Sequence, residues 1–158
     1  MTEKRQRRLA LVASKGTLDG AYPALILATT AASLGWEVAI FFTFYGLDII
    51  HKKRHKKLKV SPLANPAMPM AVPSLVGALP GMTAAATAMM KGWMKRSHMP
   101  GVEEFLEMAR ESRVRLYACS TTMGVMGIGP QDLLPNAEIA GATAFLDFAA
   151  DADVSLFV

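Results

Sequence analysis

The amino-acid sequence predicts an α/β protein built on a parallel sheet. Apolar segments of strand length alternate with segments of helical pattern along its 158 residues, which is typical of βαβ units. The first apolar segment, residues 9–13, contains no polar position, as expected for a strand that is covered on both faces. Because 52% of the residues are hydrophobic and 19% are charged, we expect a single domain with a sizeable core.

The first part of the chain predicts two strands with a helix between them. Residues 1–8 are expected to form a basic N-terminal tail, followed by the strand at 9–13 and a glycine-containing turn. The Ala- and Leu-rich segment 22–34 predicts a buried helix that ends at Gly35, and 37–44 predicts the second strand. The apolar run after the basic tail is too short for a signal peptide. The turn glycines match neither the P-loop nor the Rossmann pattern, so nucleotide binding is only weakly indicated.

Positive charge is concentrated in residues 1–59, where eleven Lys and Arg face four Asp and Glu. Much of it lies in 51–59, which we expect to form an exposed basic helix. At helical spacing His51 and His55 would share one face, but no neighbouring carboxylate or thiol completes a metal site. No metal or other cofactor is therefore predicted. Because no aromatic residues are interleaved, nucleic-acid binding is not predicted either, and docking of an acidic partner is the alternative role.

Residues 60–94 form a segment rich in methionine and proline. No charged residue occurs from Val60 to Met90, but five prolines argue against a continuous membrane helix. Residues 82–94 predict a helix with four methionines, a residue that fills irregular gaps and lines adaptable surfaces. We expect this segment to be a lid or a subunit interface. Peripheral contact with a membrane is the less favoured alternative.

The remainder of the chain predicts a further alternation of helices and strands. Residues 102–111 have the pattern of an amphipathic helix, with acidic residues near its start and Arg110 near its end, as the helix dipole favours. A strand at 114–118, a short helical stretch beginning at Gly129-Pro130, a strand at 138–140, a helix at 143–150 and a last strand at 153–158 complete the pattern.

The only cysteine, Cys119, lies between a predicted strand and a predicted helix. Ser120, Thr121 and Thr122 follow it, and hydroxyl residues are typical of a helix start because their oxygens accept unpaired N–H groups. A thiol at this junction favours its thiolate form, so Cys119 is the candidate catalytic residue. The alternative is a buried structural cysteine. A single cysteine excludes an internal disulfide and fits a reducing compartment, so we expect a cytoplasmic protein.

Other site residues follow from the expected sheet. Ligands of parallel sheets bind beyond the carboxyl ends of the strands, and this rule places Lys15, Tyr45 and Cys119 at one edge. Ser120, Thr121 and Thr122 would support the sulfur by donating hydrogen bonds. Lys15 is the candidate activating cation, although a solvent-facing lysine is the alternative interpretation. No histidine lies near Cys119 in the sequence, so a Cys–His pair is not predicted.

The last forty residues resemble the DsrE/DsrF-like family of sulfur-relay proteins, in its longer methionine-rich branch that is often labelled peroxiredoxin-like. The resemblance rests on Ala118-Cys119 with the following Met123 to Ile128, on Asp132-Leu133, on Glu138 to Gly141 and on Leu156 to Val158. It implies a three-layer α/β/α fold with a five-stranded parallel sheet over residues 9–158. It also implies a homo-oligomer, a trimer or a hexamer, and a cysteine that accepts and passes on sulfane sulfur.

The resemblance places Cys119 at the family's cysteine position and implies a TusA-like sulfur carrier or a rhodanese-like protein as partner. Some members carry a second cysteine, which this chain lacks, so a cycle through an internal disulfide is excluded. Peroxiredoxin chemistry requires a Thr/Pro-x-x-Cys turn, whereas Leu116-Tyr117-Ala118 precede the cysteine here.

The predicted function is sulfur trafficking, with sulfane sulfur carried as a persulfide on Cys119, by either a sulfurtransferase or a stoichiometric carrier. One alternative is a non-catalytic oligomeric binding module whose methionine-rich pocket holds an apolar ligand or a metal. The other is a scaffold that docks through residues 51–59.

Overall fold

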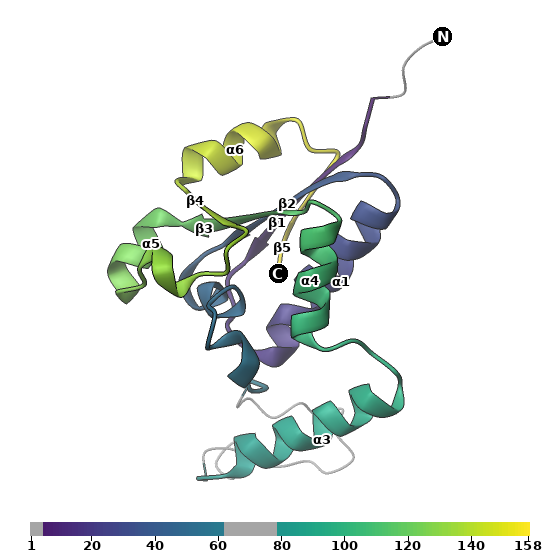
Figure 1. Cartoon of the computed structure of the whole chain (residues 1–158), viewed down its shortest axis with the longest axis vertical. Coiled ribbons are helices and arrows are strands. Elements are labelled where there is room, and N and C mark those ends of the chain that lie inside the picture. The colour runs from purple at the N-terminus through teal and green to yellow at the C-terminus, as the bar shows by residue number, and fades with distance from the viewer. Residues whose placement is uncertain (1–4, 62–78) are drawn as a thin grey trace.

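Five parallel strands form one sheet between helices in the computed structural model, which describes residues 5–61 and 79–158 (Figure 1). The strand order is β4-β3-β2-β1-β5, so the first strand lies inside the sheet. The fold class predicted from the sequence is confirmed. The strands are β1 (Arg8–Ala13), β2 (Glu37–Phe42), β3 (Arg115–Cys119), β4 (Ala137–Ala140) and β5 (Val154–Phe157).

Helices cover both faces of the sheet (Figure 1). The helices α1 (Leu18–Ser33) and α4 (Val102–Glu111) pack together on one face, and α6 (Ala142–Ala150) lies on the other. The helix α5 (Ser120–Met126) follows β3 directly, and α3 (Met82–Arg96) projects away from the sheet. Three short 3-10 helices complete the described chain: η1 (Phe44–Ile49), η2 (His55–Lys57) and η3 (Pro130–Asp132).

Two apolar clusters hold these layers together. The larger lies between the sheet and the α1–α4 pair, and Leu11, Leu25, Ile40 and Leu116 are fully buried in it. The smaller lies beneath α6, where Phe145 stacks on Phe41 of the sheet with ring centroids 5.0 Å apart. The three central strands are therefore covered on both faces, which is the physical reason why their sequences lack the polar alternation of an exposed strand.

Outside the basic segment, the predicted boundaries lie within two residues of those observed, except at the start of the first helix. The predicted helix begins at residue 22, whereas α1 begins at Leu18, because the Thr17 hydroxyl accepts a hydrogen bond from the Gly20 N–H at 3.2 Å and caps the helix four residues earlier. Gly35, which follows the helix, has the left-handed φ of +79° expected at a helix end. The amphipathic helix predicted at 102–111 is confirmed as α4, and the helix predicted at 82–94 as α3.

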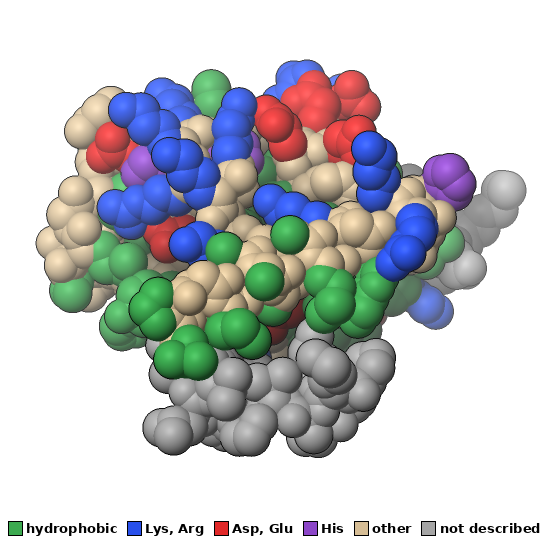
Figure 2. All heavy atoms as spheres, turned by 90° about the horizontal axis from the view of Figure 1, so that it is seen from below, with side chains coloured by type: hydrophobic (Ala, Val, Ile, Leu, Met, Phe, Trp, Pro, Cys, Tyr) green, Lys and Arg blue, Asp and Glu red, His purple; other side chains and the backbone are tan. Residues whose placement is uncertain are grey.

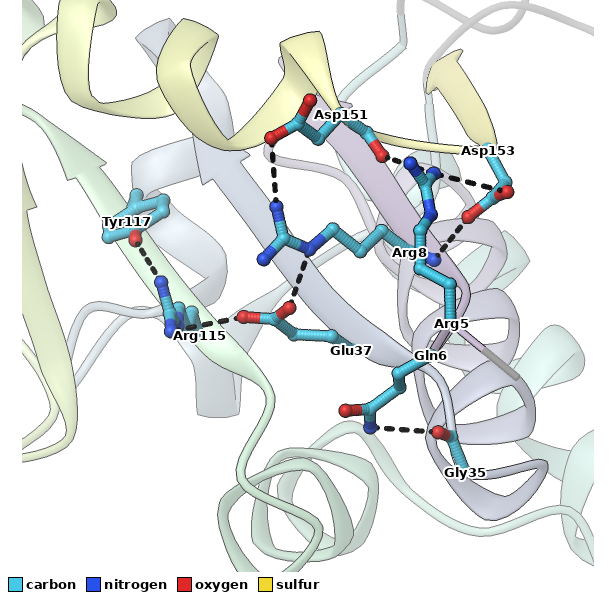
Figure 3. Close-up of polar contacts among 9 residues, drawn as sticks. All are labelled: Arg5, Gln6, Arg8, Gly35, Glu37, Arg115, Tyr117, Asp151 and Asp153. Carbon is cyan, nitrogen blue, oxygen red and sulfur yellow. Dashed lines mark hydrogen bonds and ion pairs between the residues drawn. The ribbon is translucent and has the colours of Figure 1, made fainter. Parts of the chain in front are cut away.

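Ion pairs close the edge of the sheet at which the strands begin (Figure 3). The Glu37 carboxylate is shared by Arg8, whose Nε lies 2.6 Å from it, and by Arg115, whose Nη2 lies 3.1 Å from it. Both guanidinium groups also lie over the ring of Phe148, at 5.4 and 5.6 Å from its centroid. Arg5 pairs with Asp153 at 3.4 Å, so part of the predicted N-terminal tail contacts the sheet.

The predicted basic helix at 51–59 is wrong. His51 and His55 are buried, and the backbone forms turns and the single 3-10 turn of η2. The His51 Nδ1 accepts the N–H groups of Lys53 and Arg54 at 3.1 and 3.4 Å, and the His55 Nδ1 lies 2.8 Å from the His51 carbonyl oxygen. These side chain–backbone hydrogen bonds compete with those of a continuous helix. His51 and His55 therefore do not share an exposed face. They are buried and hold the turn through hydrogen bonds to its backbone, and we call this pair the histidine clamp.

The segment predicted as a lid or interface, 60–94, is described only in part, because residues 62–78 lie outside the described residues. The helix described in it, α3, contacts the larger apolar cluster through Ala86, Met90 and Met94. The buried Thr87 accepts the Val60 N–H at 3.0 Å, which fixes α3 beside the end of the basic segment. Of the helices in 5–61 and 79–158, none is both long enough and apolar enough to cross a membrane.

The histidine clamp predicts a pH-dependent stability. Burial lowers the pKa of His51 and Arg54 lowers it further, although Asp132 and Asp48 act in the opposite direction. In the unfolded chain His51 has the ordinary histidine pKa of about 6.5 and takes up a proton near that pH, while the ring in the folded protein stays neutral. The titration of His51 should therefore leave the free energy of unfolding unchanged above about pH 6.5 and lower it as the pH falls below that value.

Urea denaturation between about pH 8 and about pH 5 measures this dependence. The change His51→Asn, which keeps an acceptor but does not titrate, should weaken the decline in stability. His98→Asn is the matched control, because His98 is exposed and has a φ of +53° that asparagine tolerates. Equal declines in the parent and the His51→Asn protein would contradict the assignment.

Candidate functional site

The candidate site lies where β3 ends at Cys119 and α5 begins at Ser120. The Cys119 side chain belongs to the smaller apolar cluster, together with Tyr117, Phe145 and Phe148, and is only 8% exposed. The thiol is therefore sheltered by the α6 layer and lies at the carboxyl edge of the sheet. This is the edge at which parallel α/β proteins bind their ligands.

Two threonine hydroxyls form a chain that ends on the sulfur. The Thr122 Oγ1 donates to the Cys119 Sγ at 3.3 Å, and the Thr43 Oγ1 lies 3.0 Å from the Thr122 Oγ1. In the hydrogen bond between Thr43 and Thr122, either hydroxyl can be the donor. Thr122 is 4% exposed, so solvent competes little for these bonds. The arrangement stabilises negative charge on the sulfur.

The pKa of Cys119 reflects two opposing influences. Burial raises the pKa of the thiol, because it disfavours the charged form. Hydrogen bonding from the Thr122 hydroxyl and backbone, from the Thr43 hydroxyl and from the Thr121 backbone lowers it by more. The resulting pKa lies below that of an ordinary thiol, so the thiolate fraction near neutral pH is increased. A lowered pKa and near-complete burial therefore coexist at this residue.

Thr43 is the residue that the sequence analysis missed. The second strand was predicted to continue through residue 44, which made Thr43 an interior strand position. In the structure β2 ends at Phe42, which pairs with Ala118, so the next residue, Thr43, lies beside Cys119, the last residue of β3. A hydroxyl residue at the end of a neighbouring strand was the available signal, but its use required the strand order and register.

The other predicted supporting residues are placed differently. Ser120 and Thr121 are exposed, and Ser120 faces the turn before α6, where a Cβ built on Gly141 would lie 3.9 Å from its Oγ. Lys15 and Tyr45 lie at the same sheet edge. Neither forms a hydrogen bond with Cys119 within residues 5–61 and 79–158. Of the three residues predicted to donate to the sulfur, Thr122 does so through its hydroxyl, and Thr121 acts through its backbone.

Close backbone contacts hold the rest of this edge together. A Cβ at Gly46 would lie 2.0 Å from the Ala13 carbonyl oxygen, and one at Gly16 would lie 2.3 Å from the Tyr45 carbonyl oxygen. The Gly46 N–H also donates to the Ser14 carbonyl oxygen at 3.1 Å. The backbone of the turn after β1 therefore packs closely against the backbone that follows Thr43. Within the described parts of the chain, no cluster of three His, Cys, Asp or Glu residues is placed to hold a metal ion.

Comparison with known proteins agrees with this architecture. The model of the DsrE/DsrF/DrsH-like family matches residues 5–157. The chain is 45% identical over 159 residues to the sulfur carrier protein DsrE2 of Allochromatium vinosum, covering 97% of this chain and 99% of that protein. It is 31% identical to the uncharacterized protein YrkE of Bacillus subtilis, over the full length of both.

A solved structure has the same fold. The crystal structure of the ychN protein from E. coli superposes with a TM-score of 0.55 and covers 97% of this chain and all of that one, at 11% identity. The resemblance read from the last forty residues thus extends over nearly the whole chain. The protein belongs to the DsrE/DsrF/DrsH-like family.

Proposed function

We propose that this protein carries sulfane sulfur as a persulfide on Cys119 and passes it to the thiol of a partner protein. The observation that supports this most is the hydrogen bond from the Thr122 hydroxyl, itself bonded to Thr43, to a buried thiol whose pKa is lowered. The similarity to a protein named a sulfur carrier supports the same class of chemistry. A free thiol suits a reducing compartment, so the proposed place of action is the cytoplasm.

The proposed exchange consists of two balanced displacements. In the first, the Cys119 thiolate attacks the outer sulfur of a donor persulfide, an S–S bond forms, the donor's S–S bond breaks, and the donor leaves as a thiolate. In the second, an acceptor thiolate attacks the outer sulfur on Cys119, which leaves as a thiolate. No oxidant, reductant or cofactor is consumed.

The residues around the sulfur suit both steps. Stabilisation of the Cys119 thiolate by Thr122 raises the attacking fraction in the first step and makes Cys119 a better leaving group in the second. Since the chain has a single cysteine, both donor and acceptor thiols belong to other molecules. A TusA-like carrier or a rhodanese-like protein remains the proposed partner, on the basis of the sequence resemblance.

One observation favours the alternative of a binding module. A cavity of about 610 Å³ lies between α1, α3 and α4 and is lined by Tyr22, Met94, Met99 and several lysines. An apolar ligand held there would require no chemistry at Cys119. The loading experiment below separates the two proposals, because only the carrier gains sulfur covalently.

Sulfur loading should occur only at Cys119. Intact-mass measurement after incubation with polysulfide should show the addition of one or more sulfur atoms to the parent and none to Cys119→Ser. Ser120→Ala is the matched control, because it removes an exposed neighbouring hydroxyl and should load like the parent. Sulfur retained by Cys119→Ser, or no adduct on the parent, would refute the carrier function.

The reactivity of the thiol should depend on Thr122. Replacing Thr122 by valine keeps the shape of the side chain but removes the hydroxyl that donates to the sulfur. The pKa of Cys119 should therefore rise, and the rate of iodoacetamide alkylation near neutral pH should fall several-fold. Thr121→Val should leave the pKa of Cys119 and the rate of alkylation unchanged, because the exposed Thr121 acts through its backbone. A folded protein whose Cys119 resists alkylation at every pH would instead have a structural cysteine.

We further propose that the protein forms a homo-oligomer, a trimer or a hexamer. Large apolar side chains are exposed on both edge strands and on α6, among them Ile139 (48%), Leu146 (61%) and Phe157 (73%). Exposed apolar surface of this kind marks subunit interfaces.

Light scattering without detergent should therefore give a mass of at least three chains, and the double change Leu146→Asp with Phe157→Asp should reduce it. Met108→Asp, a change at an exposed apolar side chain on α4, should not. A monomeric parent, or a parent recovered only from membranes, would contradict the proposal.

A further inference from the structure

A basic platform lies beside the sheet edge that carries Cys119. We use this name for the exposed side chains of Lys52, Lys53, Arg54, Lys56, Lys57 and Lys59. Figure 2 shows Lys and Arg side chains gathered on this face of the molecule. Their neighbours in the chain, His51, His55, Leu58 and Val60, are buried. The segment therefore packs its histidines and apolar side chains inside and exposes its cations.

The backbone under the platform is fixed along its length. At its start, the Lys52 N–H donates to the Asp132 carbonyl oxygen at 2.8 Å, and His51 forms an isolated antiparallel β-bridge with Leu133. In its middle, the two histidines hold the turn. At its end, the Lys59 carbonyl oxygen accepts the Leu18 N–H at 2.8 Å. The cations are therefore presented on a preorganised surface, which reduces the entropy lost when they meet a partner.

Few acidic groups neutralise this surface. Arg54 pairs with Asp48 at 2.8 Å and Lys56 with Glu103 at 3.0 Å. Lys53, Lys57 and Lys59 have no ion pair within residues 5–61 and 79–158. Like charges held close together on a rigid backbone repel one another, and an external anionic surface relieves that repulsion. The charge pattern therefore fits an acidic partner.

A groove joins the platform to the sheet edge. It has a volume of about 500 Å³, and its lining includes Gly16, Thr17, one carboxylate, Asp48, and four cations, Lys53, Arg54, Lys57 and Lys59. Gly16 lies against the carbonyl of Tyr45, and two residues earlier Thr43 bonds to Thr122, whose hydroxyl donates to the Cys119 sulfur. A molecule seated in the groove would thus be next to the chain segment that reaches the thiol.

We propose that this groove and the basic platform bind an acidic segment of the protein that exchanges sulfur with Cys119. The proposal rests on the proposed function, because it assumes that a partner thiol comes to this edge. No aromatic side chain lines the groove, so the base-stacking surface typical of single-strand binding is lacking among the described residues. Complementary charge at such a place raises the rate of encounter and orients the partner.

The experiment uses a peptide with one cysteine flanked by glutamates, and the same peptide with glutamines in place of the glutamates. The platform variant combines Lys53→Ser, Lys57→Ser and Lys59→Ser, which removes cations without breaking an ion pair. The control variant combines Arg7→Ser, Arg96→Ser and Arg113→Ser, exposed cations of the same total charge that lie outside the platform and the groove and have no ion pair within the described residues. Loading of Cys119 is first confirmed by intact mass for each protein.

Sulfur transfer from loaded Cys119 to the glutamate peptide should be about tenfold or more slower for the platform variant at low salt. It should be unchanged for the control variant, and transfer to the glutamine peptide should be unchanged for both. Added salt should slow transfer from the parent towards the rate of the platform variant. Equal rates in the parent and the platform variant would overturn the proposal while leaving the carrier function intact.

Binding is measured separately by fluorescence anisotropy, with a glutamate peptide whose cysteine is replaced by serine and with unloaded protein. The parent should bind it, and the platform variant should lose most of that affinity. This arm decides the docking proposal even if Cys119 takes up no sulfur, a result that would refute only the proposed function. Tighter binding of oligothymidylate or of phosphatidylserine vesicles than of the glutamate peptide would overturn the proposal.

Discussion

The register between β2 and β3 is the constraint on which the candidate site depends. Phe42 lies opposite Ala118, and in a parallel pair the residues that follow leave the sheet on the same edge. Thr43 therefore emerges beside Cys119, and Thr122, which lies in the first turn of α5, completes the hydroxyl chain. A shift of one residue in this pairing would turn Thr43 to the other face of the sheet and leave the sulfur without its second hydroxyl.

Burial and hydrogen bonding act on Cys119 in opposite senses, and the site uses both. The apolar cluster beneath α6 shelters the sulfur from solvent, which on its own would favour the neutral thiol. The threonine chain restores the stability of the charged form without admitting water. A persulfide held there would combine an activated sulfur with limited access for competing small molecules. This combination suits a protein that must hold a reactive group between two exchanges.

Much of the fold could be predicted from the sequence, because apolar periodicity reports directly on burial. The uniformly apolar strand 9–13 and the amphipathic pattern of 102–111 reflect the layers that cover them. The basic segment could not be predicted, since the inward orientation of His51 and His55 depends on backbone hydrogen bonds that leave no periodic pattern. Cys119 and Thr122 were accessible from their place at a helix start. Thr43 was not, because its role comes from strand register and not from local sequence.

The pairing of β5 with β1 has a consequence for folding. Leu9 lies opposite Val154, so the two strands that meet are among the most distant segments of the described chain. Such a non-local contact forms only after a large loop closes, and folds rich in these contacts are slow to complete. Until β5 docks, one side of β1 presents unpaired N–H and C=O groups in an apolar strand, a template for pairing with another chain. Once β5 is paired, the ion pair of Arg5 with Asp153 links the segments that precede the two strands.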